Sequence, residues 1–428
     1  MNIKKYRLFL CILFCPMLAE HSYADKFFGS VSVASEESNN ARKTTTDPIS
    51  ERQDQYNLHL GGEVTNSLLD FNAEYLATAR NYAKDTQENN NLLEGKSALL
   101  IGKNTQPADL LIEHSRVTVL KKPDATPLAE NQDEREITSA TPTLRGRLSP
   151  VDYIYLQGKL TKINYAENGN KNSQREGGIL GLEHKISTTD KIQLFAQQTD
   201  IDFDSSPLEN YVYRSAEFAY STQLRQLSYS VQVGMNQSIP ENEEKVLRPK
   251  YAFELIFNSG TQTFSLSLLQ ELTDASLGGG NKVADGQPPS ENDSAHNLDR
   301  FERKNVTASW RTQALCDSCS LVIGAYHIRD HYLPLEQLST QQGWNVGLNY
   351  SLSHRSLITT SILKGDSAFT DSTFGEDFKS TSVRVAFVHK LNNDFSLGFH
   401  VNNEKRDSRL DSETYSERFI GASVSYEF

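Results

Sequence analysis

The chain has 428 residues, and its 55 acidic against 43 basic side chains leave a formal net charge of −12. No basic cluster with interleaved aromatic residues occurs. An acidic chain of this kind repels phosphates, so a nucleic-acid partner is not expected. After residue 24 no apolar run approaches the ~20 residues that a membrane-spanning helix needs.

The first segment, MNIKKYRLFLCILFCPMLAEHSYA, has the three parts of a secretory signal peptide. Its start is basic, its middle is apolar from Leu8 to Leu18, and Ser22 and Ala24 give the small-residue spacing that signal peptidase requires. We therefore expect residues 1–24 to be removed on export. Residues 25–428 are then expected to form a single domain.

Along the rest of the chain, apolar residues alternate with polar ones in one segment after another. The pattern appears at 56–64, 251–257, 264–268, 344–352, 395–401 and 420–428. Strict alternation predicts strands with one apolar and one polar face. Helical spacing does not fit any of these windows.

The connections between these segments are of two alternating kinds. Short ones rich in turn-forming residues lie at 66–67, 149–152, 188–190, 258–260, 354–355 and 392–394. Longer polar ones lie around 35–55, 81–91, 121–137, 165–174, 237–247, 274–299, 331–342, 367–376 and 404–415. Short turns on one side and long loops on the other are typical of outer-membrane barrels. The predicted fold is therefore all-β: a transmembrane, antiparallel, up-and-down β-barrel of about 20 strands (18–22).

A secreted β-sandwich or β-helix would also alternate. Many segments here run to about ten residues or more, however, which is longer than the usual strand of a soluble protein. The polar positions carry Asn, Ser, Gln, Gly and scattered charges. Such residues suit a watery lumen better than a packed core, so the barrel is favoured.

The chain ends in GASVSYEF, which alternates up to its last residue. In lipid every backbone polar group must be paired, so a last strand that closes the barrel against the first has to stay ordered to its end. The candidate first strand is FFGSVSV, Phe27–Val33. The ending, with Val424, Tyr426 and a terminal Phe428, resembles the signal by which the assembly machinery recognises Gram-negative outer-membrane barrels. The resemblance implies that machinery as a partner and the outer membrane as the location.

A wider resemblance covers Leu148 to Met235, including LSPVDYIYLQGKLTKINYAENGNKNSQREGGILGLEHKISTTDKIQLFAQQTDIDF and YVYRSAEFAYSTQLRQLSYSVQVGM. This region is similar to the porin-like outer-membrane barrels associated with exopolysaccharide and PEP-CTERM sorting systems. The resemblance implies a conduit and supplies no catalytic residues.

Charged residues at polar positions of the predicted strands are the candidate pore-lining residues. They are Glu63, Glu183, Lys185, Glu254, Arg311 and Arg384. Charged rings tune selectivity when they line a pore. The same residues could equally form salt bridges in a blocked lumen, and both interpretations stay open.

Cys316 and Cys319 form the one CxxC sequence after residue 24. A redox site would place the first cysteine at a helix start, and a structural zinc site would need a second pair. Because the segment lies at a predicted short turn, a disulfide across that turn is favoured. We expect no metal site and no cofactor.

The longest predicted loop, 274–299, is acidic and contains GGG and PP. It could fold into the lumen as a constriction or close over a ligand, or it could be a mobile surface loop. The histidines at 327 and 331 resemble a metal-binding spacing, but on a strand rather than on the helix that this motif needs.

These observations favour a porin-like conduit that assists exopolysaccharide export or passive solute diffusion. The alternative is a structural or adhesive barrel with a blocked lumen that binds a partner through its extracellular loops. An enzyme is not expected. The expected partners are outer-membrane lipid and lipopolysaccharide, the barrel assembly machinery, and polysaccharide or small solutes.

Overall fold

The computed structural model describes residues 24–428, except 103–105, 123, 242, 275, 277–299, 334–335 and 371–374. The expected signal peptide before residue 24 and most of the loop 274–299 lie outside the described residues. Twenty strands make up the fold: β1 (Ala24–Ser38), β2 (Glu51–Thr65), β3 (Leu69–Tyr82), β4 (Asn90–Ile101), β5 (Ala108–Leu120), β6 (Gln132–Arg147), β7 (Asp152–Tyr165), β8 (Ser173–Lys185), β9 (Asp190–Phe203), β10 (Tyr211–Gln223), β11 (Leu227–Pro240), β12 (Val246–Asn258), β13 (Gln262–Asp274), β14 (Arg300–Thr312), β15 (Cys319–Tyr332), β16 (Gln337–Ser353), β17 (Ser356–Phe369), β18 (Phe378–Lys390), β19 (Phe395–Ser408) and β20 (Tyr415–Glu427).

The strands form one closed antiparallel barrel. Each strand pairs with its neighbours in sequence, and β20 pairs with β1 to close the ring. Val33 lies opposite Val424, and Gly29 and Phe428 exchange both of their backbone hydrogen bonds, at 3.0 and 2.9 Å. The predicted barrel and its closure are confirmed. The first strand is longer than the predicted Phe27–Val33 because pairing with β2 extends it at both ends.

Alternate residues of each strand face out of the barrel and into it. Large apolar side chains on the outer face are widely exposed. Leu156, Leu180 and Phe399, for example, are 54%, 55% and 54% exposed. Their neighbours Gln157 and Ile179 line an internal cavity instead. An outer apolar surface on a closed sheet is what a barrel in a bilayer presents to lipid.

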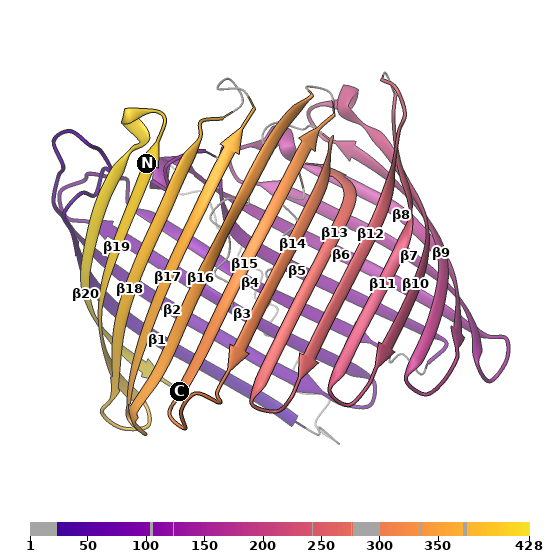
Figure 1. The fold of residues 1–428 in the computed structure, drawn as a ribbon, viewed down its shortest axis with the longest axis horizontal. Helices are drawn as coiled ribbons and strands as arrows, with labels where there is room; N and C mark the ends of the chain where they lie inside the picture. Colours follow the sequence, from indigo (N-terminus) through magenta and orange to yellow (C-terminus); the bar gives the residue numbers. More distant parts are fainter. Residues whose placement is uncertain are drawn as a thin grey trace, which may run out of the picture.

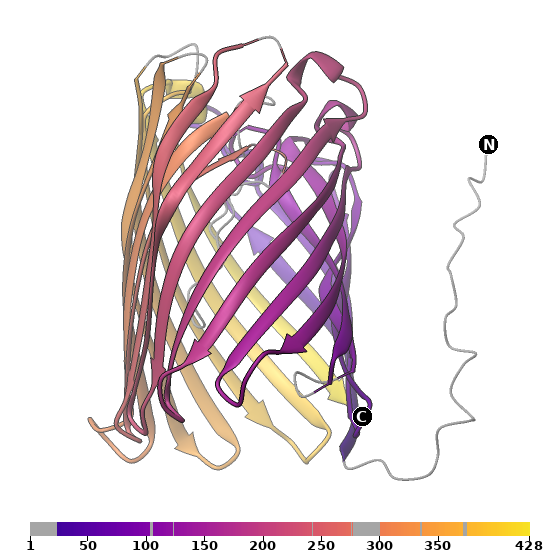
Figure 2. The same cartoon turned by 90° about the vertical axis from the view of Figure 1, so that its right-hand side faces the viewer.

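The connections divide between the two ends of the barrel as predicted. The short turns lie at the end where the chain terminates (Figures 1 and 2). Side-chain oxygens fix them: Asn66 Oδ1 accepts from the N–H groups of Leu68 and Leu69 at 2.8 and 2.9 Å, and Asn392 does the same two and three residues on. The longer connections lie at the other end, and within the described residues four of them contain a 3₁₀ turn: η2 (Ala129–Asn131), η3 (Gly169–Lys171), η4 (Pro207–Glu209) and η6 (Asp411–Glu413). The connection 204–210 was absent from the predicted long set.

The barrel looks wider in Figure 1, viewed down its shortest axis, than in the perpendicular view of Figure 2. Its cross-section is therefore flattened. Strands β7 to β10 form one narrow edge, and β19 and β20 lie at the other (Figure 1). The hydrogen-bonded ladder stops early in two places. Pairing of β4 with β5 ends at Gly95 and Arg116, and pairing of β12 with β13 ends at Tyr251 and Gln270. Among the described residues, no helix is long and apolar enough to span a membrane.

Candidate functional site: the lumen and its polar networks

Polar side chains line the lumen along the whole length of β2. On β2 the inner face carries Glu51, Gln53, Gln55, Asn57, His59, Gly61 and Glu63, alternating with the exposed Tyr56, Leu58 and Leu60 of the outer face. The sequence produces this track by period-two alternation alone.

The six predicted pore-lining residues all alternate with outward-facing apolar residues, but the structure does not bring them into one ring. Lys185 and Glu254 share a cavity of about 420 Å³ beside the short turn that contains Thr188 and Thr189. Glu183 accepts from Gln193 Nε2 at 3.0 Å and lies 3.4 Å from Lys191 Nζ.

The other three candidates lie on separate strands. Arg384 lines a cavity of about 410 Å³ near the long-loop end. Glu63 lies opposite Lys26 and Asn72, and Arg311 lies opposite Thr263 and Val322. Charge along the lumen is therefore distributed in small groups.

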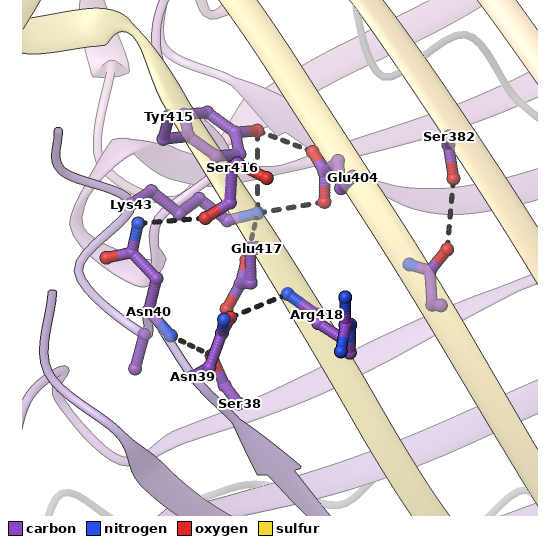
Figure 3. A network of polar contacts seen from close by, with 12 residues as sticks. Ser38, Asn39, Asn40, Lys43, Ser382, Glu404, Tyr415, Ser416, Glu417 and Arg418 are labelled. Carbon is purple, nitrogen blue, oxygen red and sulfur yellow. Dashed lines mark hydrogen bonds and ion pairs between the residues drawn. The ribbon is translucent and has the colours of Figure 1, made fainter.

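A buried ionic network lies beside the point where β1 pairs with β20 (Figure 3). Lys43, from the loop between β1 and β2, lies 3.0 Å from Glu404 and 2.8 Å from Glu417. Tyr415 donates to Glu404 at 2.5 Å, and Ser38 donates to Glu417. Burial alone would lower the pKa of the Lys43 amine, but Tyr415, Glu404 and Glu417 together raise the pKa well above its ordinary value. Lys43 is therefore a cation at neutral pH, and it fastens a loop to the inner wall.

The loop between β5 and β6 crosses the mouth near this network. Arg406 on β19 donates to the carbonyl oxygens of Asp124 and Ala125, and Thr126 donates to Glu413. Glu376 N also donates to Asp124 at 3.1 Å. Connections far apart in the sequence thus meet over one side of the long-loop opening and narrow it.

A second buried network lies at the opposite narrow edge. Arg175 on β8 donates to both oxygens of Asp274, at 2.8 and 2.7 Å, and Tyr211 on β10 donates to Asp274 at 2.5 Å. Asp274 is wholly buried. Ser276 accepts from Arg175 and, through its carbonyl oxygen, from Tyr165 at 3.0 Å. The end of β13, where the loop 277–299 begins, is thereby fixed to three other strands.

The remaining predicted residues lie at the short-turn end. Cys316 and Cys319 are joined by a disulfide between β14 and β15, with Cα atoms 5.3 Å apart. Val424, Tyr426 and Phe428 are exposed on the outer face, and the Tyr426 ring lies 4.8 Å from that of Phe395. Within the described part of the chain, no group of three or more His, Cys, Asp or Glu is placed to hold a metal ion.

Sequence reasoning missed the residues of both buried networks. Lys43 and Glu417 are separated by almost the whole chain, and Arg175 and Asp274 lie on strands that are not neighbours. A charged residue at the loop end of a strand looks like solvated surface when read alone. The one available signal was the concentration of Lys, Arg, Asp and Glu near the long-loop ends of strands whose middles carry few charges.

No family model matches the chain, and no curated protein matches it. Among solved structures, a ferric enterobactin receptor of Pseudomonas aeruginosa is 9% identical with a TM-score of 0.45, covering 94% of this chain and 80% of that one. The siderophore receptor PirA of the same organism is 13% identical with a TM-score of 0.45, covering 95% and 81%. A loop-deleted OmpT, an outer-membrane protein of Vibrio cholerae, is 9% identical with a TM-score of 0.38, covering 95% and 99%.

Proposed function

We propose that the protein is a porin-like conduit of the outer membrane through which small polar solutes diffuse passively. The observation that carries the proposal is the polar track along the inner face of β2 in a closed barrel of twenty strands. Barrels of 16–18 strands leave an aqueous channel, and a larger ring encloses a wider one.

The outer face supports the outer-membrane location. It carries large exposed apolar residues around the ring, and aromatic residues gather where the chain ends, with Phe395, Tyr426 and Phe428 in contact. Aromatic girdles mark the membrane boundary in such barrels. Outer-membrane lipid, lipopolysaccharide and the assembly machinery follow as proposed partners, while catalysis is no part of the proposal.

The mouth gives the conduit a size limit. Lys43 and the loop between β5 and β6 cover one side of the opening at the long-loop end. Solutes therefore pass beside these residues rather than through the full cross-section. We therefore propose small polar solutes as the primary cargo. The resemblance to exopolysaccharide-associated barrels adds extended polysaccharide chains as a second cargo class to be tested.

The experiment is solute-driven swelling of liposomes that contain the refolded protein residues 25–428. A series of neutral sugars of increasing size should enter at rates that fall steeply with size. Heat-unfolded protein in the same lipid is the control. Equal swelling with folded and unfolded protein would contradict the proposal.

A further inference from the structure

A cavity without charged walls lies on the inner side of the narrow edge formed by β7 to β10 (Figure 1). Its volume is about 340 Å³. Two aromatic rings and three amides line it: Tyr155, Phe195, Gln157, Gln193 and Gln232. None of its described lining residues carries a charge, whereas the cavities near the mouth and at the short-turn end each contain several charged side chains. The cavity is therefore a neutral patch in a charged lumen.

The Tyr155 ring lies across Gly181 of the neighbouring strand β8. The two residues are paired, and a Cβ atom added at Gly181 would lie 2.1 Å from Tyr155 Cζ and 2.5 Å from Cε1. The ring thus occupies the space that a side chain at Gly181 would fill, while Tyr155 stays partly exposed. Phe195 pairs with Gly181 from the other side, so the Cα atoms of Tyr155 and Phe195 are two strand spacings apart, about 10 Å.

The three amides are held by their nitrogen atoms. Gln193 Nε2 donates to a carboxylate of β8 at 3.0 Å, and Gln232 Nε2 donates to a carboxylate of β10. Gln157 Nε2 donates to a hydroxyl of β6 at 3.3 Å. None of the three Oε1 atoms accepts a hydrogen bond from a residue that the structure describes. Each amide oxygen is therefore free to accept a hydrogen bond from a ligand.

The two carboxylates that hold these amides already have cationic partners. Glu183 lies 3.4 Å from Lys191 Nζ, and Glu217 lies 3.0 Å from Lys250 Nζ. Neither carboxylate is among the described residues that line the cavity. A cationic ligand would find these charges paired, and an anionic ligand would face amide oxygens, which cannot donate. The cavity is therefore suited to a neutral donor of hydrogen bonds.

A sugar combines the features that these walls require. Its hydroxyl groups donate to amide oxygens, and the C–H groups on one face of a pyranose ring pack against an aromatic ring. Small-ligand pockets usually measure about 300–1,000 Å³. The cavity lies within that range, near its lower end.

We propose that this cavity is a subsite that binds one unit of a neutral saccharide on its way through the lumen. The sugar ring packs on Tyr155, and its hydroxyl groups donate to the oxygens of Gln157, Gln193 and Gln232. The subsite rests on the proposed conduit and names neutral saccharides as the favoured class among its polar solutes.

Binding is tested by isothermal titration calorimetry of the refolded protein residues 25–428 in detergent. The neutral probes are maltotriose and cellotriose, of which at least one should bind. The glucosamine trimer, a cation, and trigalacturonate, an anion, have the same length and should bind more weakly. Absence of binding by both neutral trisaccharides, or tighter binding of either charged one, would overturn the proposal.

The aromatic contact is tested with two substitutions. Tyr155→Ala should weaken binding of the neutral trisaccharide about threefold to tenfold, as expected for one aromatic contact. Gly181→Ala keeps the ring but displaces it, and should weaken binding in the same direction. Gly347→Ala on β16 is the matched control, because nothing lies within 4 Å of the added Cβ atom. Equal binding by wild type and Tyr155→Ala would overturn the proposal.

The amide contact is tested at Gln157, whose protein partner is a hydroxyl, so that no carboxylate loses its donor. Gln157→Leu should weaken binding about threefold to tenfold, the effect of one hydrogen bond. Gln55→Leu, which removes a lumen glutamine from another cavity, is the control and should leave binding unchanged. Equal losses in the two variants would contradict a subsite at Gln157.

Conductance of the same proteins in a planar bilayer separates the subsite from the conduit. Binding requires access to the cavity but no transport. A barrel that conducts ions and binds neither neutral trisaccharide would overturn the subsite alone. A folded barrel that does not conduct would overturn the conduit, and with it the passage of the bound sugar.

Discussion

At the scale of single residues, Lys43 is the side chain on which the mouth depends most. It pairs with two carboxylates and is 7% exposed. Removing one member of a buried ion pair leaves uncompensated charge and costs about 3–5 kcal/mol. We expect Lys43→Met to lower the free energy of unfolding by that amount, measured by denaturant titration in detergent. Arg52→Ala is the matched control, because its pair with Asp54 is exposed and should be worth about 0–1 kcal/mol.

The pH dependence of this contribution has a definite sign. The pKa of Lys43 is raised in the folded barrel, so its stabilisation is fully present below the ordinary lysine pKa of 10.5 and is lost only as pH rises through the higher folded value. The difference in unfolding free energy between wild type and Lys43→Met should therefore stay level from neutral pH up to the ordinary lysine pKa of 10.5. A difference that already shrinks near neutral pH would contradict a charged, paired Lys43.

Asp274 is the central residue of the buried network at the other narrow edge of the barrel. It accepts from Arg175 and Tyr211 and is wholly buried. Asp274→Asn should leave the Arg175 charge without its partner and cost about 3–5 kcal/mol of stability. The unfolding free energy is measured by denaturant titration followed by tryptophan fluorescence. Surface substitutions usually change it by about 0.5 kcal/mol or less. A change below about 1 kcal/mol for Asp274→Asn would therefore contradict this role.

At the scale of strands and turns, the closing strand is the element most exposed to failure. Phe428 supplies both hydrogen bonds to Gly29 and packs on the outer face beside Tyr426. Deleting Phe428 should reduce the fraction of barrel assembled in outer membranes, measured by heat-modifiable migration on gels. Phe395→Ala removes an aromatic ring at the same end but no backbone pairing, so it should assemble closer to normal.

The turn between β14 and β15 should matter much less. A disulfide that closes only the short segment from Cys316 to Cys319 removes little chain entropy, so Cys316→Ser/Cys319→Ser should cost no more than about 2 kcal/mol. Thermal unfolding under non-reducing conditions measures this difference. Loss of the folded barrel in the double variant would show that the turn contributes far more than its length implies.

The strands and their connections could be predicted from sequence because their causes are local. Alternation fixes which face of a strand meets lipid, and turn residues such as Asn66 and Asn392 fix where it ends. The connection 204–210 was not predicted, although it is as long as the predicted connection between β7 and β8. The early ends of two ladders could not be predicted from one strand at a time, because pairing depends on both strands of a pair.

At the scale of the whole molecule, the flattened cross-section accounts for the network around Asp274, whereas the Lys43 network joins strands that are already neighbours. The narrow edges bring strands such as β8 and β13 within side-chain reach, and polar residues there pair with each other instead of with water. The six predicted lumen charges lie mostly away from these networks. Period-two alternation indicates on which face of a strand a residue lies, whereas curvature, which no local pattern encodes, determines which inward-facing residues meet.

Single-channel conductance in a planar bilayer measures whether the lumen is an open aqueous channel. The refolded protein should give large, steady, ohmic steps. In a salt gradient the reversal potential should show cation preference, which Glu63→Gln/Glu183→Gln/Glu254→Gln weakens and Lys185→Gln does not, because carboxylates in the lumen attract cations. Absence of steps from protein shown to be folded would mean a blocked lumen. It would favour the alternative in which the loops bind a partner.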